Sequence, residues 1–133
     1  MRAKPFGLAV SALVRDTRGR LLVLKRAGSS RFWAGLWDLP GGKVRQAERI
    51  DLALRREARE ETGLRVVPMR LAGAVDFCPG STQVVLLVLE AGCKPGRVRL
   101  SPEHDAFEWA TPKRLESLAF VPHIGSFLRR YLL

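Results

Sequence analysis

The chain has 133 residues, of which 47% are hydrophobic, a length that suits one domain over residues 1–133 with its own core and excludes a second domain of ordinary size. Its 23 lysines and arginines outnumber its 13 acidic residues and give a net charge of +10, which favours phosphates, nucleotides and other polyanions as ligands. Because the basic residues are scattered along the chain, a basic surface that only maintains solubility explains the composition equally well.

The first half of the chain predicts two strands joined by a turn, then a loop and a helix. The strands are expected over residues 6–14 and 20–24 with the turn at 16–19 between them, the loop over 28–37 and the helix over 50–62. Both strands are apolar runs, and the Asp-Thr-Arg-Gly turn between them is typical of a hairpin. Gly63 follows the helix at the position that a C-terminal cap prefers, so the helix is expected to end there.

The second half predicts two more strands and two helices. The strands are expected over residues 65–77 and 84–89, and the helices over residues 112–118 and 124–132. The first strand should be interrupted near Pro68, and Thr111 is a typical N-cap for the first helix. Apolar residues recur at helical spacing in the last segment, which indicates an amphipathic helix. Strands and helices mix without strict alternation, which predicts an α/β fold with a mixed sheet packed against helices.

The helix over residues 50–62 carries glutamates on its apolar side. At about 100° per residue, that side consists of Ile50, Ala53, Leu54 and Ala58. Glu57 and Glu61 fall within it and Glu60 lies at its edge, although like charges at these spacings destabilise a helix. Carboxylates that face inward are costly unless cations neutralise them, and Mg²⁺ or Mn²⁺ prefers such oxygen ligands. The alternative is a cluster of salt bridges with Arg56 and nearby basic residues.

This helix and the turn before it match a known signature. Residues 39–43 read Leu-Pro-Gly-Gly-Lys, a tight turn whose glycines permit unusual backbone angles and close approach of a ligand. Together with the helix, the turn resembles the Nudix box, G-x5-E-x7-R-E-U-x-E-E-x-G-U, where U is aliphatic. The matching residues are Gly42, Glu48, Arg56, Glu57, Ala58, Glu60, Glu61, Gly63 and Leu64. Residues 37–42 and 108–112 are also similar to family segments, so the resemblance covers most of the chain and favours the MutT-like branch.

The resemblance implies a fold and a metal site. The fold is an α/β/α sandwich, a mixed sheet between helices with the box as a loop–helix–loop. Glu57, Glu60 and Glu61 are implied to bind Mg²⁺ or Mn²⁺ together with the backbone carbonyl of Gly41. A late acidic residue often joins such sites, and Glu103, six residues before a tryptophan, is the candidate. An exposed loop acid with no such role is the other interpretation of Glu103.

Further box residues are implied to shape the site. Arg56 and Glu48 are expected to hold the loop in shape through an ion pair, and Arg56 is also counted among the catalytic residues. Gly42 and Gly63 are expected to have structural roles in the box. The implied chemistry is attack of water on phosphorus, in which metals acidify the water and offset charge. A glutamate takes the proton, and either Glu57 or Glu103 fits that role.

The substrate is less constrained than the reaction. The MutT-like branch hydrolyses nucleoside triphosphates, including oxidised ones, to a monophosphate and pyrophosphate. Arg26 matches a basic position that contacts substrate there, and Trp37 and Leu39 are further substrate-binding candidates. The asparagine with which that branch recognises a modified guanine is replaced near Phe120. ADP-ribose is the alternative substrate, because family members specific for it carry a proline where Pro79 lies.

Other features bound the partners and the location. An inactive Nudix domain that binds nucleotide or RNA would use the same basic charge, but such domains usually lose a box glutamate and none is missing here. Nucleic acid is therefore compatible but not required, and a homodimer stays open. Cys78 and Cys93 form no zinc or disulfide motif, and no apolar stretch reaches the length of a membrane span, so a cytoplasmic protein is expected. His104 and His123 are isolated, and no catalytic role is expected for them.

Overall fold

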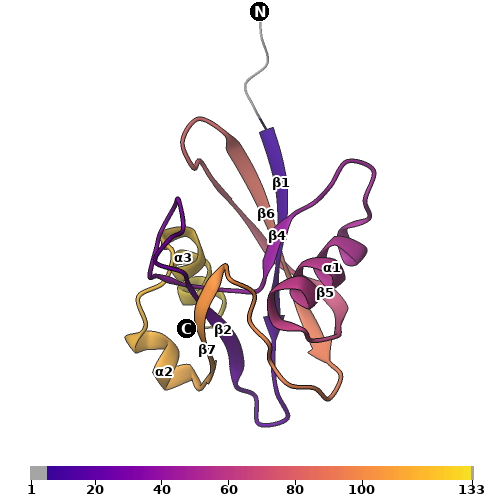
Figure 1. The fold of residues 1–133 in the computed structure, drawn as a ribbon, viewed down its shortest axis with the longest axis vertical. Coiled ribbons are helices and arrows are strands. Elements are labelled where there is room, and N and C mark those ends of the chain that lie inside the picture. Colours follow the sequence, from indigo (N-terminus) through magenta and orange to yellow (C-terminus); the bar gives the residue numbers. More distant parts are fainter. Residues whose placement is uncertain (1–5, 133) are drawn as a thin grey trace, which may run out of the picture.

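The computed structural model describes residues 6–132 and divides them among seven strands and three helices (Figure 1). In chain order these are β1 (Phe6–Val14), β2 (Leu21–Arg26), β3 (Trp37–Asp38), β4 (Gly41–Lys43), α1 (Ile50–Thr62), β5 (Val66–Phe77), β6 (Gln83–Cys93), β7 (His104–Ala110), α2 (Pro112–Ser117) and α3 (Pro122–Tyr131). No helix in this part of the chain has both the length and the apolar character needed to cross a membrane.

The strands form two sheets. One has the order β4-β1-β6-β5, and within it β1 and β6 run parallel from the Phe6–Gln83 pair to the Val14–Ala91 pair while the other neighbours are antiparallel. The other has the order β3-β2-β7 and is antiparallel throughout. The mixed sheet predicted from the sequence is therefore confirmed, with an antiparallel sheet beside it.

Helices cover the strands on two sides, with α1 on one side and α2 and α3 on the other (Figure 1). Side chains of β1 alternate between the two resulting cores: Leu13 packs in the core that includes residues of α3, and Val10 packs in the core that includes Leu54 of α1. Burial on both faces explains why β1 is an almost continuous apolar run rather than an alternating one.

Three local expectations need correction. The predicted turn forms, with the Gly19 N–H donating to the Asp16 carbonyl, but β1 and β2 enter different sheets after a single bridge between Arg15 and Leu21. Pro68 does not interrupt β5, because β5 lies at a sheet edge where bulges shift the register around the proline. Ile50, expected on the buried side of α1, is 37% exposed in the first turn of the helix.

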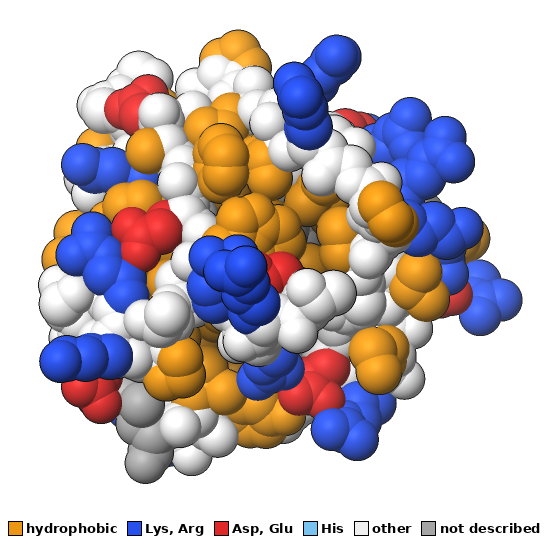
Figure 2. Space-filling model, turned by 90° about the horizontal axis from the view of Figure 1, so that it is seen from below, with side chains coloured by type: hydrophobic (Ala, Val, Ile, Leu, Met, Phe, Trp, Pro, Cys, Tyr) orange, Lys and Arg blue, Asp and Glu red, His pale blue; other side chains and the backbone are white. Residues whose placement is uncertain are grey.

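On the face drawn in Figure 2, the basic side chains are scattered, as they are along the sequence. Lysines and arginines lie all round this face and also near its middle, with acidic side chains among them, and hydrophobic side chains are exposed between them. No single basic stripe crosses the face that is drawn.

Candidate active site

The end of α1 places carboxylates at three different depths. Glu61 is only 5% exposed, Glu57 is half-buried, and the Glu60 side chain is 53% exposed. The inward orientation predicted for Glu57 and Glu61 therefore matches their burial. Gly63 ends the helix with φ at 73°, a left-handed conformation that favours glycine, and its N–H caps the Arg59 carbonyl.

Glu61 is a buried carboxyl group with which no lysine or arginine of residues 6–132 forms an ion pair. Its Oε1 accepts a hydrogen bond from the Gly41 N–H at 2.8 Å. Burial raises the pKa of Glu61 to about 9, and the nearby Glu103 and Glu57 carboxylates act in the same direction. A divalent cation would supply the missing positive charge, so the donor set fits a metal with oxygen ligands.

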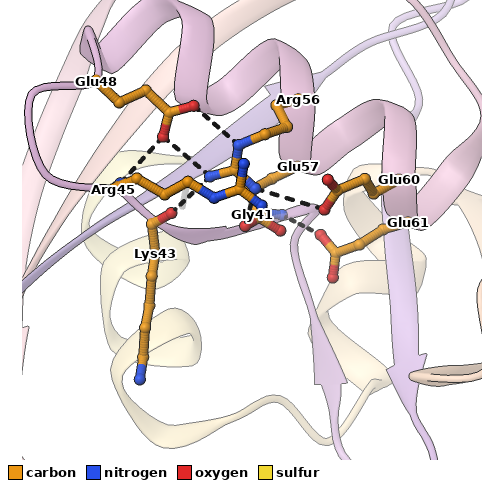
Figure 3. Close-up of polar contacts among 8 residues, drawn as sticks. All are labelled: Gly41, Lys43, Arg45, Glu48, Arg56, Glu57, Glu60 and Glu61. Carbon is orange, nitrogen blue, oxygen red and sulfur yellow. Dashed lines mark hydrogen bonds and ion pairs between the residues drawn. The ribbon is translucent and has the colours of Figure 1, made fainter.

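Arg56 connects the loop before α1 to the helix (Figure 3). Its guanidinium donates to both Glu48 oxygens at 2.8 and 3.0 Å, to the Lys43 carbonyl at 3.0 Å and to Glu57 at 2.8 Å. The hydrogen bonds from Arg56 lower the pKa of Glu48 to about 2. Ion pairs with Arg56 thus neutralise Glu48 and Glu57, whereas within residues 6–132 Arg56 forms no ion pair with the buried Glu61.

Two glycines lie against this cluster because no side chain fits there. A Cβ on Gly42 would lie 2.4 Å from the carboxyl carbon of Glu57, and one on Gly41 would lie 2.1 Å from the Val10 carbonyl oxygen. Neither glycine has a positive φ. The sequence-based interpretation that they permit unusual backbone angles is therefore wrong, while their close approach to other groups is confirmed.

Gly42→Ala is expected to reduce turnover about tenfold or more while the fold is kept. The new methyl group would displace the end of the flexible Glu57 side chain rather than backbone, so the cost falls on carboxylate placement instead of stability. Steady-state kinetics and thermal unfolding measure both effects. Gly92→Ala is the matched control, because a Cβ there meets only Met69 at 3.9 Å. Normal turnover in a folded Gly42→Ala protein would contradict the placement of Glu57 in the site.

The start of β7 brings two more residues to the cluster. The register between β2 and β7 shifts after Lys25, so that His104 rather than Asp105 lies opposite Arg26. Ligand atoms of Glu61, Glu103 and His104 then lie within 4.8 Å of one another. The structure thus brings the exposed Glu103 beside Glu61. His104, which the sequence-based analysis set aside, is buried there, and burial lowers its pKa to about 4.

Two adjoining hollows open beside these carboxylates. A cleft of about 620 Å³, here called the carboxylate cleft, is lined by Arg26, Lys43, Glu57, Glu61 and Glu103 together with neighbouring loop residues. A smaller hollow of about 220 Å³, here called the aromatic hollow, is lined by Phe32, Trp33, Asp38, Leu39, Phe77 and His123 among others. Arg26, Gly41, Gly42 and Lys43 line both, so the two hollows adjoin each other at those residues.

The predicted substrate-binding residues fall in different places. Arg26 lies at the junction of the two hollows and is fixed by hydrogen bonds to the Phe32 carbonyl at 3.0 Å and to Asp38 at 3.3 Å. Leu39 lines the aromatic hollow, but Trp37 is not among the lining residues of either hollow and packs against the core beside α3. Of the three aromatic residues Phe32, Trp33 and Trp37 that could stack on a base, Phe32 and Trp33 line the aromatic hollow and Trp37 does not.

The aromatic hollow also contains residues that sequence analysis did not connect. The ring of His123 stacks on Phe77 with centroids 3.7 Å apart, and Trp33 meets both rings edge-on. Burial raises the pKa of Asp38 at the floor of this hollow. These residues come from a loop, β3, β5 and α3, and only the tertiary fold brings them together.

Sequence comparisons with known proteins find relatives of this chain. The chain is 36% identical over 107 residues to a MutT-like protein of Streptomyces ambofaciens, and the match covers 79% of this chain but only 64% of that protein. It is 28% identical over 108 residues to the nucleoside triphosphatase NudI of Escherichia fergusonii, covering 73% of this chain and 77% of that protein.

A solved structure is similar over nearly the whole chain. The crystal structure of a MutT protein from Methanosarcina mazei Go1 superposes with a TM-score of 0.90 at 35% identity, covering 98% of this chain and 96% of that one, which confirms the α/β sandwich. The NUDIX domain model matches residues 5–131. The chain therefore belongs to the NUDIX family and resembles its MutT-like members.

Proposed function

We propose that this chain is a divalent-metal-dependent hydrolase that cleaves a nucleoside triphosphate to a nucleoside monophosphate and pyrophosphate. The observation that carries the proposal is the buried Glu61 carboxyl group, which lines a carboxylate cleft that shares lining residues with the aromatic hollow. The cleft has the chemistry for phosphates and a cation, and the hollow has the chemistry for a nucleobase.

Each part of the site would have a distinct task. Glu57, Glu60, Glu61, Glu103 and the Gly41 carbonyl would hold Mg²⁺ or Mn²⁺. When bound, the cation offsets phosphate charge and acidifies water. Arg26 and Lys43, which line both hollows, would bind the phosphates and orient the phosphorus atom for attack. The proton of the attacking water would pass to a carboxylate, and Glu57 and Glu103 are the two candidates.

The triphosphate is favoured over ADP-ribose by the relatives. The Escherichia fergusonii relative is named a nucleoside triphosphatase and the similar solved structure a MutT protein. ADP-ribose remains the second candidate, because Pro79 lines the aromatic hollow next to Phe77, where a second sugar would have to fit. Magnesium or manganese as the cation, a cytoplasmic location and a homodimer remain predictions.

Product identity distinguishes these substrates. Purified protein should hydrolyse nucleoside triphosphates with higher kcat/KM than ADP-ribose, because three phosphates can bridge the Arg26 junction and the carboxylates. Chromatography of the products would then show nucleoside monophosphate and pyrophosphate. Formation of AMP and ribose 5-phosphate from ADP-ribose at higher efficiency would favour the alternative. Absence of hydrolysis of either compound, together with tight RNA binding, would support an inactive binding domain instead.

A further inference from the structure

We propose that His104 is a positioning residue of the metal site, whose Nδ1–H donates to Oε2 of Glu61 and holds that carboxylate in its metal-binding orientation. This inference rests on the proposed metal-dependent function. It assigns a role to a histidine that the proposed reaction does not otherwise use.

The first observation is an unpartnered nitrogen. His104 is 6% exposed, and its Nδ1 is buried without a hydrogen-bond partner among the described residues. A buried polar atom left unpaired is unfavourable, and such atoms often mark a functional site. The nearest acidic atom to Nδ1 is Oε2 of Glu61 at 3.7 Å. The ring therefore points at the carboxyl group that the cation would need.

The second observation is that, in the part of the chain that the structure describes, only one of the two Glu61 carboxylate oxygens has a hydrogen-bond donor. Oε1 already accepts a hydrogen bond from the Gly41 N–H at 2.8 Å. The distance of 3.7 Å from Oε2 to Nδ1 of His104 is longer than a hydrogen bond. Ionised Glu61 would attract the Nδ1–H, so a shift of less than an ångström, about 0.8 Å for a typical hydrogen-bond length, would close the gap. Each oxygen would then have one fixed donor, and its remaining lone pair would be free for a cation.

The third observation is that the backbone links His104 to Glu61. The Ser101 N–H donates to the Glu61 carbonyl at 3.1 Å, and the His104 N–H donates to the Ser101 carbonyl at 3.2 Å. On the other side, the Ala27 N–H donates to the Glu103 carbonyl at 2.9 Å. The segment from Ser101 to His104 is thus tied both to the end of α1 and to the end of β2. Such rigid support is what a residue that orients a metal ligand requires.

His104→Leu and His104→Asn separate this role from a purely structural one. Leucine fills the space without a donor, whereas asparagine offers an N–H near the position of Nδ1. Mn²⁺ affinity, measured on the substrate-free protein by electron paramagnetic resonance of unbound Mn²⁺, should weaken about 10- to 100-fold in His104→Leu. His104→Asn should recover most of that loss. His123→Asn, in the aromatic hollow, is the matched control and should bind Mn²⁺ like the unaltered protein.

In the metal-free protein, a positioning role and a packing role of His104 predict opposite changes in the unfolding temperature of His104→Leu. His104→Leu removes an unpaired buried nitrogen, so the metal-free variant should unfold at the same or a higher temperature. Loss of a histidine needed only for packing would instead lower the unfolding temperature of the metal-free protein. Lower metal-free stability of His104→Leu, whatever its Mn²⁺ affinity, would therefore overturn the proposal.

Nitrogen NMR of the Mg²⁺-loaded protein tests the hydrogen bond directly. The chain has two histidines, so His123→Asn assigns the His104 signals. A protonated Nδ1 is expected, and an unprotonated Nδ1, or one bound directly to the cation, would overturn the proposal. If the protein binds Mn²⁺ as expected but hydrolyses no nucleotide, the proposed function fails while the role of His104 stands. If it hydrolyses nucleotides with metal but His104→Leu binds Mn²⁺ normally, only the role of His104 fails.

Discussion

Glu61→Gln is expected to lower turnover at least about 100-fold while the protein stays folded. The substitution keeps an oxygen that can accept the Gly41 N–H but removes the charge that a cation would neutralise. Steady-state kinetics at saturating Mg²⁺ measures the loss, and circular dichroism confirms the fold. Glu116→Gln, on the exposed surface of α2, is the control for loss of one carboxylate and should retain full turnover.

The same variant should be more stable than the unaltered protein when metal is absent. Burial raises the pKa of Glu61 to about 9, so the folded protein binds this proton more tightly than the unfolded chain does. Stability is therefore lost as pH rises above the unfolded value of about 4.5 and up to about 9, and glutamine escapes this loss. The difference in unfolding temperature should grow over that window. A folded Glu61→Gln protein with near-normal turnover would show that the site is assigned wrongly.

Sequence alone was sufficient for features that depend on local periodicity. The helix over residues 50–62, its Gly63 cap and the inward side of Glu57 and Glu61 follow from spacing within a single element. The Thr111 cap of α2 is equally local, since its side chain accepts the Arg114 N–H three residues later. These features need no knowledge of which strand lies beside which.

Sequence was insufficient where distant segments decide the geometry. The parallel pairing of β1 with β6 and the shift in register between β2 and β7 depend on contacts between segments far apart in the chain. Without that shift there was no reason to place His104 beside Glu61. Likewise, the loop before β3 gives Trp33 a positive φ of 53° and directs that residue, rather than Trp37, to the aromatic hollow. The only hint in the sequence was that His104 directly follows Glu103.

Removal of divalent metal is expected to abolish hydrolysis completely. Without a cation, Glu61 keeps its proton, and the Glu57 and Glu103 carboxylates in the same cleft repel the phosphates of a substrate, so a nucleotide cannot bind productively there. Activity in excess EDTA should fall to background and return when Mg²⁺ or Mn²⁺ is added. Full turnover in the chelator would refute the metal-dependent reaction.

Metal should also stabilise the fold, and it should do so more strongly at higher pH. A cation that binds only the folded protein raises the unfolding temperature, and the rise is larger when the cation binds more tightly at a given concentration. Binding requires Glu61 to lose its proton, and the pKa of about 9 in the metal-free protein means that this proton is released into solution on binding. The rise in unfolding temperature on addition of Mg²⁺ should therefore increase from about pH 6 toward about pH 9. Glu61→Gln should show a small rise that does not depend on pH, and an equal pH dependence in both proteins would assign the released proton to another group.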